Sequence, residues 1–153
     1  MPVLYMERSA LGGLTERDIK KIIEENEGGT KYQRLEGYYV GDHDILRYTK
    51  KDKAVPNNRL VNNMPRYITD TAVGYFLGKP VTYSSQDDAF LQALQDIFDY
   101  NDEQDENTEL AKTASIDGSC FEMLYMDEDA MIRFVKVAPG SCVMIYETGY
   151  STP

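Results

Sequence analysis

The chain has 153 residues, of which 42% are hydrophobic, and this length favours one domain with a core of its own. It has no apolar run of about eighteen residues, and its first residues lack the basic start and long apolar stretch of a secretory signal. Its formal net charge of -10, from 26 acidic and 16 basic residues, disfavours a broad face that grips DNA or RNA. We therefore expect a cytoplasmic protein with no membrane partner.

Residues 1–13 show no clear period, so we expect a flexible N-terminal arm there. The first helix should follow, because Thr15 is a good N-cap and Asp18 stands at the third helical position, as in a capping box. Its apolar stripe is narrow, which predicts a peripheral helix. Gly28–Gly29 is expected to end this helix, and Thr30 to begin a second, short one.

The triplet Asp42-His43-Asp44 contains the only histidine of the chain. A carboxylate can orient an imidazole for metal binding or base catalysis, so the triplet raises that possibility. Side chains adjacent in sequence rarely point together, however, and no second histidine or cysteine nearby completes a metal site. We favour a turn or an interface role over chemistry.

Residues 45–48 read as a short strand or extended segment, and residues 49–58 as a polar loop. A basic cluster accompanies this loop: Lys50, Lys51, Lys53 and Arg59. A solvated loop is the favoured interpretation of this cluster, with a nucleic-acid contact as the alternative.

The best-marked helix lies between Asn63 and Gly78. Asn62 or Asn63 can cap it, Pro65 suits its first turn, Gly78 suits a left-handed residue that closes it, and Pro80 forbids continuation. The Gly-Lys at its end is not a phosphate-binding loop, because the glycines end a helix where that motif begins one. One face is apolar and is expected to be buried: Met64, Tyr67, Ile68, Thr71, Ala72, Tyr75 and Phe76.

A further helix is expected after Ser84 or Ser85, either of which can cap it, with two aspartates in its first turn. Its apolar face consists of Phe90, Leu91, Leu94, Ile97 and Phe98. The acidic run 99–109 begins like a calcium loop, but Gln104 replaces the required glycine and Leu110 the last ligand. We expect this run to link two helices, and we expect no metal and no cofactor.

The period changes to two after Gly118, which predicts strands over 120–126 and 132–137 joined as a hairpin, then a third strand over 142–146. Cys120 and Cys142 are interpreted as small buried hydrophobes rather than a disulfide. The fold class is therefore α+β, with a mainly helical first two-thirds followed by a small antiparallel sheet. Because the chain ends directly after a strand, we expect it to be truncated from a longer polypeptide.

Four blocks together carry a family resemblance: Tyr38 to Ile45, Pro56 to Asn63, Tyr67 to Asp70, and Gly74 to Val81. In this order and spacing they resemble the front part of tailed-bacteriophage portal proteins, the head-to-tail connectors of phages with long non-contractile tails. The resemblance covers most of residues 14–147. It implies a wing-like α+β domain over residues 14–153, with the clip, stem and crown of the family absent.

The resemblance also implies a structural protein of the virion, made in the bacterial host cytoplasm and not an enzyme. Members form a homo-oligomeric ring, expected to be dodecameric, at one capsid vertex, where terminase, scaffolding or capsid proteins and head-completion proteins dock. Double-stranded DNA passes through the ring without sequence-specific binding. Two alternatives stay open: an interaction module that forms no ring, and an enzyme fragment that uses Asp42, His43 and Asp44.

Six residues of the resembling blocks are candidates for fold or subunit contacts: Asn58, Arg59, Asn63, Tyr67, Asp70 and Tyr75.

Overall fold

The structure, a computed structural model, describes residues 3–24, 28–50 and 54–147. Helices dominate as far as residue 117, and strands follow, which confirms the predicted α+β class. The elements are β1 (Val3–Met6), α1 (Arg8–Leu11), α2 (Glu16–Glu24), α3 (Gly28–Val40), the 3-10 helix η1 (Asp44–Arg47), α4 (Met64–Leu77), α5 (Asp88–Asn101), α6 (Glu103–Asp117), β2 (Phe121–Met126), β3 (Ile132–Val137), the 3-10 helix η2 (Pro139–Ser141) and β4 (Met144–Glu147).

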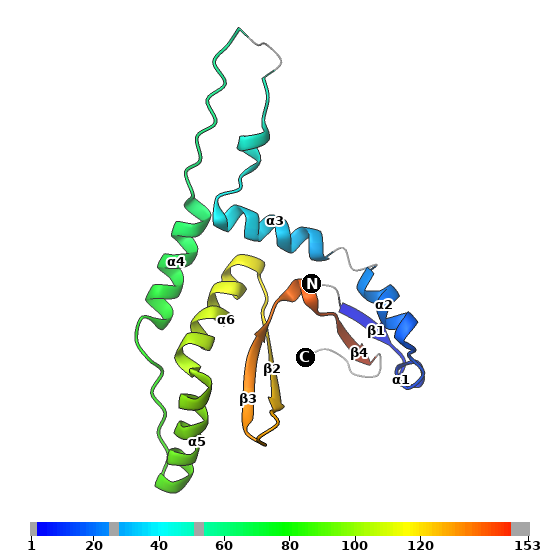
Figure 1. Cartoon of the computed structure of the whole chain (residues 1–153), viewed down its shortest axis with the longest axis vertical. Coiled ribbons are helices and arrows are strands. Elements are labelled where there is room, and N and C mark those ends of the chain that lie inside the picture. The colour runs from blue at the N-terminus through cyan, green and yellow to red at the C-terminus, as the bar shows by residue number, and fades with distance from the viewer. Residues whose placement is uncertain (1–2, 25–27, 51–53, 148–153) are drawn as a thin grey trace.

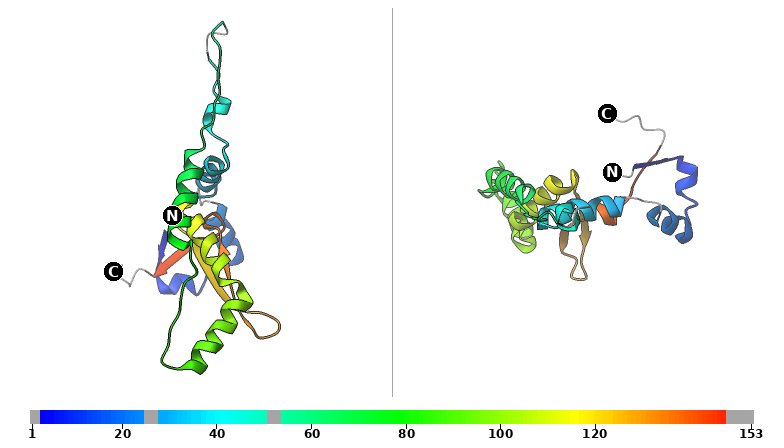
Figure 2. Two further views of the ribbon diagram at one scale, coloured as in Figure 1. Left: turned by 90° about the vertical axis from the view of Figure 1, so that its left-hand side faces the viewer. Right: turned by 90° about the horizontal axis from the view of Figure 1, so that it is seen from above.

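Figure 1 shows α4 beside the rod formed by α5 and α6, with α3 across the end of α6. Residues 44–50 and 54–63, which we name the finger, extend from the junction of α3 and α4 well beyond α3 and α4. The β2–β3 hairpin lies against the other side of α5 and α6. The view from above in Figure 2 separates β1, α1 and α2 from the α4–α6 wall. The molecule is therefore elongated.

The predicted capping box at the start of α2 is confirmed. The Thr15 hydroxyl accepts from the Asp18 amide at 3.3 Å, and the Asp18 carboxylate accepts from the Thr15 amide at 2.9 Å. Both Ile19 and Ile23 remain exposed, as expected of a peripheral helix. The start of the next helix is a correction: α3 begins at Gly28 rather than at Thr30.

Residues 1–13 were predicted to be a flexible arm, but the described part contains β1 and α1. Strand β1 pairs in parallel with β4, with Val3 opposite Met144 and Met6 opposite Glu147. The pairing joins the two ends of the chain, so no local pattern in the first residues announces it. The expectation of no regular structure there is corrected, whereas the domain boundary at residue 14 stays a prediction.

The signals at the start of α4 are confirmed, but the closing signal is corrected in one respect. Asn63 is the N-cap, and Pro65 lies in the first turn. Gly78 ends the helix in a right-handed conformation, with φ of -66°, not in the left-handed one. A β-carbon at Gly78 would lie 2.2 Å from the carbonyl oxygen of Gly74, so close approach of the backbone explains the glycine.

The N-cap of α5 is Asp87, not a serine. Its carboxylate accepts from the amides of Ala89 at 3.0 Å and Phe90 at 3.1 Å, while Ser85 accepts from the amide of Asp87. The acidic run links two helices, as predicted, through Asp102 in a left-handed conformation.

Gly118 ends α6 with φ of 77°, and the hairpin follows as predicted. Its strands pair antiparallel, with Phe121 opposite Val137 and Met126 opposite Ile132. The third strand exists, but it pairs with β1 instead of extending the hairpin. Cys120 and Cys142 are free and only half-buried.

The described residues bury few side chains completely. Tyr32 on α3 is 4% exposed and packs close to Gly140 of η2, while Pro139 is fully buried. The accessible surface is 11765 Å². A compact monomer of 17.4 kDa is expected to expose about 7,900 Å². Among the described residues, no helix is long and apolar enough to cross a membrane.

Candidate subunit-contact surface

The junction between α3 and α4 is held by the side chain of Asn63. Its Oδ1 accepts from the backbone amide of Arg66 at 3.2 Å, and its Nδ2 donates to the carbonyl oxygen of Tyr39 at 2.9 Å. Gly41, with φ of 95°, passes close by, because a β-carbon there would lie 3.4 Å from Nδ2 of Asn63. One amide thus caps α4 and ties it to the end of α3.

A second polar contact joins the same helices about two turns further along α4. The Tyr39 hydroxyl donates to the Asp70 carboxylate at 2.8 Å, and Arg66 Nε donates to the other carboxylate oxygen at 3.3 Å. The hydrogen bond from Tyr39, followed by that from Arg66, lowers the pKa of Asp70. Burial, followed by the hydrogen bond to Asp70, raises the pKa of Tyr39. Lys112 of α6 lies 5.6 Å from the centre of the Tyr39 ring.

The Asp42-His43-Asp44 triplet makes structural contacts at the base of the finger. Asp44 accepts from the Tyr38 hydroxyl and from Arg34, each at 2.8 Å, and these bonds, that from Tyr38 first, lower its pKa. The His43 ring stacks on Tyr38, with centroids 4.9 Å apart and planes at 18°. Asp42 pairs with Arg47. Residues 44–47 form the 3-10 helix η1, which corrects the predicted strand or extended segment. Within the part of the chain that the structure describes, no cluster of histidine, cysteine and carboxylate side chains is suited to a metal.

The face of α4 that was expected to be buried is exposed. Tyr75 is 95% exposed, Phe76 76% and Tyr67 64%, and Met64 and Ile68 are also exposed. We name these five residues the outer face of α4. This is a correction: the helix packs through a narrow stripe of Pro65, Thr69, Val73 and Leu77, at steps of four. Thr69 is 6% exposed, and its hydroxyl accepts from Ser115 of α6 at 3.3 Å.

The finger is bridged by side chains bonding to backbone rather than by a strand ladder. Arg59 donates to the carbonyl oxygen of Leu46 at 2.9 Å, and Asn57 donates to that of Tyr48 at 3.1 Å. No strand is assigned in the described residues 44–50 and 54–63. Apolar side chains remain uncovered there, most of all Leu60, which is 85% exposed.

The six candidate residues therefore fall into three places. Asn63 and Asp70 lie at the α3–α4 junction, Tyr67 and Tyr75 lie on the outer face of α4, and Arg59 bridges the finger, where Asn58 is exposed. The structure brings the side chains of the first two together with Tyr39. Whether any of the six contacts another subunit stays a prediction.

A comparison with protein-family models matches residues 19–150 to the family described as phage portal protein, SPP1 Gp6-like. The match spans well over half of the chain. The chain belongs to this phage portal family. A comparison with curated proteins found no match.

The portal family is structural, which agrees with a chain whose Asp-His-Asp triplet serves the fold. All four resembling blocks lie inside the matched residues. The sequence analysis did not identify the stripe through which α4 packs against the rest of the chain. The four-residue spacing from Pro65 to Leu77 was a usable signal, but a wider apolar face on the same helix hid it.

Proposed function

We propose that this chain is part of a portal subunit: a structural, non-catalytic component of a homo-oligomeric ring at one vertex of a phage or prophage capsid. Double-stranded DNA passes through that ring, and terminase, scaffolding or capsid proteins and head-completion proteins dock to it. Residues 14–153 supply the wing-like domain. The family match supports the portal role, and the exposed outer face of α4 is the observation that supports assembly.

The exposed surface argues for assembly on physical grounds. The accessible area of 11765 Å² exceeds that expected for a compact monomer of this mass by about 3,900 Å². Obligate interfaces bury roughly 2,000–5,000 Å² in total, so the excess is of the size that subunit contacts remove from water.

The chemistry of the outer face of α4 supports a protein partner. Tyr67 and Tyr75 present apolar rings with polar tips, a side-chain type enriched at the centre of protein interfaces. Few monomeric proteins leave so many large apolar side chains uncovered on one helix. We assign this face to contact with the next subunit, and Asn63 and Asp70 to positioning the helix that carries it.

The charge of the chain fits a conduit for DNA. A net charge of -10 disfavours adhesion of a phosphate backbone to the wall that it passes.

Electron microscopy of the full-length gene product that carries these residues tests the proposal. We expect closed rings with a central hole, and a strictly monomeric product under all conditions would contradict the ring. For residues 1–153 alone we expect weak ring formation or none, and native mass spectrometry showing stable rings of this chain would prove that expectation wrong.

A further inference from the structure

The finger is built of groups that its own chain does not cover. Leu60 is 85% exposed, and Tyr48, Val55 and Val61 are also exposed. Even a two-stranded hairpin is marginally stable at best in water without a packed face, and the described residues of the finger do not form strands. Contact with another surface would remove these apolar side chains from water.

The charge of the finger is opposite to that of the rest of the chain. Its described residues, 44–50 and 54–63, hold three basic side chains and one acidic side chain, a net charge of +2. Lys50 donates to the carbonyl oxygen of Pro56 at 2.8 Å and Arg59 to that of Leu46, so both cations bind neutral oxygens. Their charge is left for an acidic partner.

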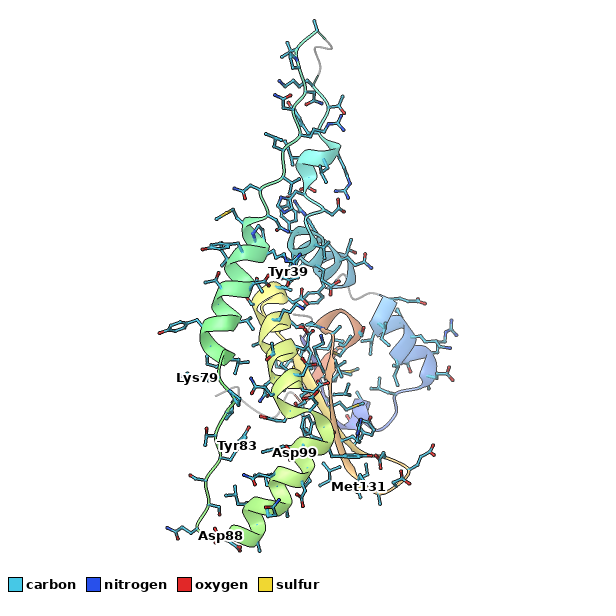
Figure 3. All side chains as sticks on the ribbon, turned by 60° about the vertical axis from the view of Figure 1, so that its left-hand side comes forward. Tyr39, Lys79, Tyr83, Asp88, Asp99 and Met131 are labelled. Carbon is cyan, nitrogen blue, oxygen red and sulfur yellow. The ribbon has the colours of Figure 1, made fainter. Side chains whose placement is uncertain are left out.

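An acidic stretch begins at the far end of α4. Residues 80–111 hold nine acidic and no basic side chains, and two of these carboxylates, Asp99 and Glu103, lie together at this end. There a cavity of about 310 Å³ opens between residues 80–83 and the helices α5 and α6, and we name it the connector cavity. Figure 3 shows Tyr83 and Asp99 close together at this place.

The connector cavity combines an apolar floor with a carboxylate. Tyr83 and Phe98 lie 4.7 Å apart by ring centroids, and Val81 adds an aliphatic wall. Glu103 accepts a hydrogen bond from the Tyr83 hydroxyl, but the Asp99 carboxylate has no hydrogen bond or ion pair within the described residues. An extended segment that carries a cation next to a leucine suits this lining.

The finger and the connector cavity lie at opposite ends of α4, a helix of 14 residues and so about 21 Å long. Two different surfaces at opposite ends of one molecule meet only between copies, head to tail, and such a contact closes into a ring when the rotation allows it. Because each copy carries a net charge of -10, a contact that sets a basic finger on an acidic surface also reduces repulsion between copies.

We infer that the finger of one copy docks into the connector cavity of the next, with Arg59 facing Asp99 and Leu60 covering the apolar floor. The inference rests on the proposed function, because it names the partner surfaces of the ring.

The test uses the full-length gene product and the variant Arg59→Lys, which keeps the charge and supplies an amine. A carbodiimide joins amines to carboxylates in contact, so ¹⁵N-labelled and unlabelled copies are mixed before coupling. We expect mixed-isotope links between the peptide of residue 59 and that of Asp99. Links to other carboxylates only, or links within one copy only, overturn the docking site.

Charge exchange tests the pair independently. Arg59→Glu should weaken association about tenfold, the scale of one lost charge-assisted contact, and adding Asp99→Arg should restore it. Arg59→Lys should associate as the wild type does, since lysine lacks the guanidinium group but keeps the positive charge that faces Asp99. Equal loss in the lysine and glutamate variants, without restoration, overturns the inference.

The outcomes separate this inference from the proposed function. Rings without links between finger and connector cavity overturn the docking site and leave the portal role standing. Absence of rings in all conditions overturns the portal role. If duplex DNA instead suppresses the links and Arg59→Glu abolishes DNA binding, the finger is a nucleic-acid contact and the docking site is wrong.

Discussion

The α3–α4 junction and the outer face of α4 both involve helix α4. They differ in whether their side chains find partners within this chain. At the junction, Asn63 uses both ends of its amide, and Asp70 accepts from two side chains. On the outer face, Tyr75 is 95% exposed and Phe76 76%. The junction carries contacts that the single chain needs to fold, whereas the outer face carries apolar surface that only another molecule removes from water. Substitutions should therefore affect folding in one region and assembly in the other.

The largest expected difference is between two tyrosines. Tyr32 is 4% exposed against η2, so Tyr32→Ala should lower the free energy of unfolding by about 3 kcal/mol or more, as for other large-to-small core changes. Tyr75→Ala should change it by less than about 0.5 kcal/mol, because the side chain is exposed. Urea denaturation of both variants measures this.

Assembly should reverse the order of these two effects. In the full-length gene product, Tyr75→Ala should reduce ring formation while leaving the fold intact, as seen by electron microscopy and circular dichroism. If rings of Tyr75→Ala form as readily as those of the wild type, the outer face is not a subunit contact.

Two glycines of α4 provide the next comparison. Gly78→Ala should lower the free energy of unfolding by about 1–3 kcal/mol, because its β-carbon would lie 2.2 Å from the Gly74 carbonyl oxygen and the backbone must shift. Gly74→Ala should raise it by about 0.5–1 kcal/mol, since nothing lies within 4 Å and alanine favours the helix. Thermal unfolding distinguishes them, and a shift of the same sign in both would contradict the geometry.

Two of the four asparagines in the block Pro56 to Asn63 test the junction directly. Asn63→Ala should lower the free energy of unfolding by about 1–2 kcal/mol. The change removes the cap of α4 and leaves the Tyr39 carbonyl oxygen without the donor that Asn63 supplies. Asn58→Ala, at an exposed position of the finger, should be nearly neutral and serves as the matched control. Urea midpoints compare them, and equal losses would mean that the bonds of Asn63 do not hold the junction.

The start of α4 and the β2–β3 hairpin were predictable because their signals are local. An asparagine before a proline specifies a helix start, and alternation over 120–126 and 132–137 specifies paired strands. The pairing of β1 with β4 was not predictable, because it joins segments more than 130 residues apart.

The buried side of α4 could not be chosen from the sequence either. Its apolar residues cover much of the circumference, and periodicity shows which residues share a face, not which face meets the same chain. The face named from the sequence is apolar, as predicted, but it is exposed in this chain. In a sequence, an apolar stripe that faces another molecule and an apolar stripe that faces the core look alike. The sequence thus placed Tyr67 and Tyr75 on an apolar face, but it did not show that this face is exposed.

Acid should lower the stability of the α3–α4 junction, by less than the substitutions above. The hydrogen bond from Tyr39 lowers the pKa of Asp70 in the folded chain below its unfolded value of about 3.9. The stabilisation is therefore complete above that value and is lost as the pH falls through the lowered folded pKa. Asp70→Asn should unfold at a lower urea concentration than the wild type at pH 7, with the difference disappearing in acid. A difference that is constant with pH would show that the charge of Asp70 does not contribute.

Asp117, at the end of α6, should show the opposite sign. It is buried, its Oδ1 has no partner among the described residues, and burial, followed by the charge of Glu36, raises its pKa. A raised folded pKa means stability that is present below the unfolded pKa and is lost as the pH rises through the folded one. Asp117→Asn should therefore stabilise the chain at pH 7, and the gain should disappear in acid, because the carboxyl group is then neutral in both states. Urea titrations of Asp70→Asn and Asp117→Asn should therefore shift in opposite directions from the wild type at neutral pH and converge on it in acid. Two curves shifted the same way at pH 7 would refute the assignment of Asp70 as a paired carboxylate and Asp117 as a buried one whose Oδ1 has no partner among the described residues.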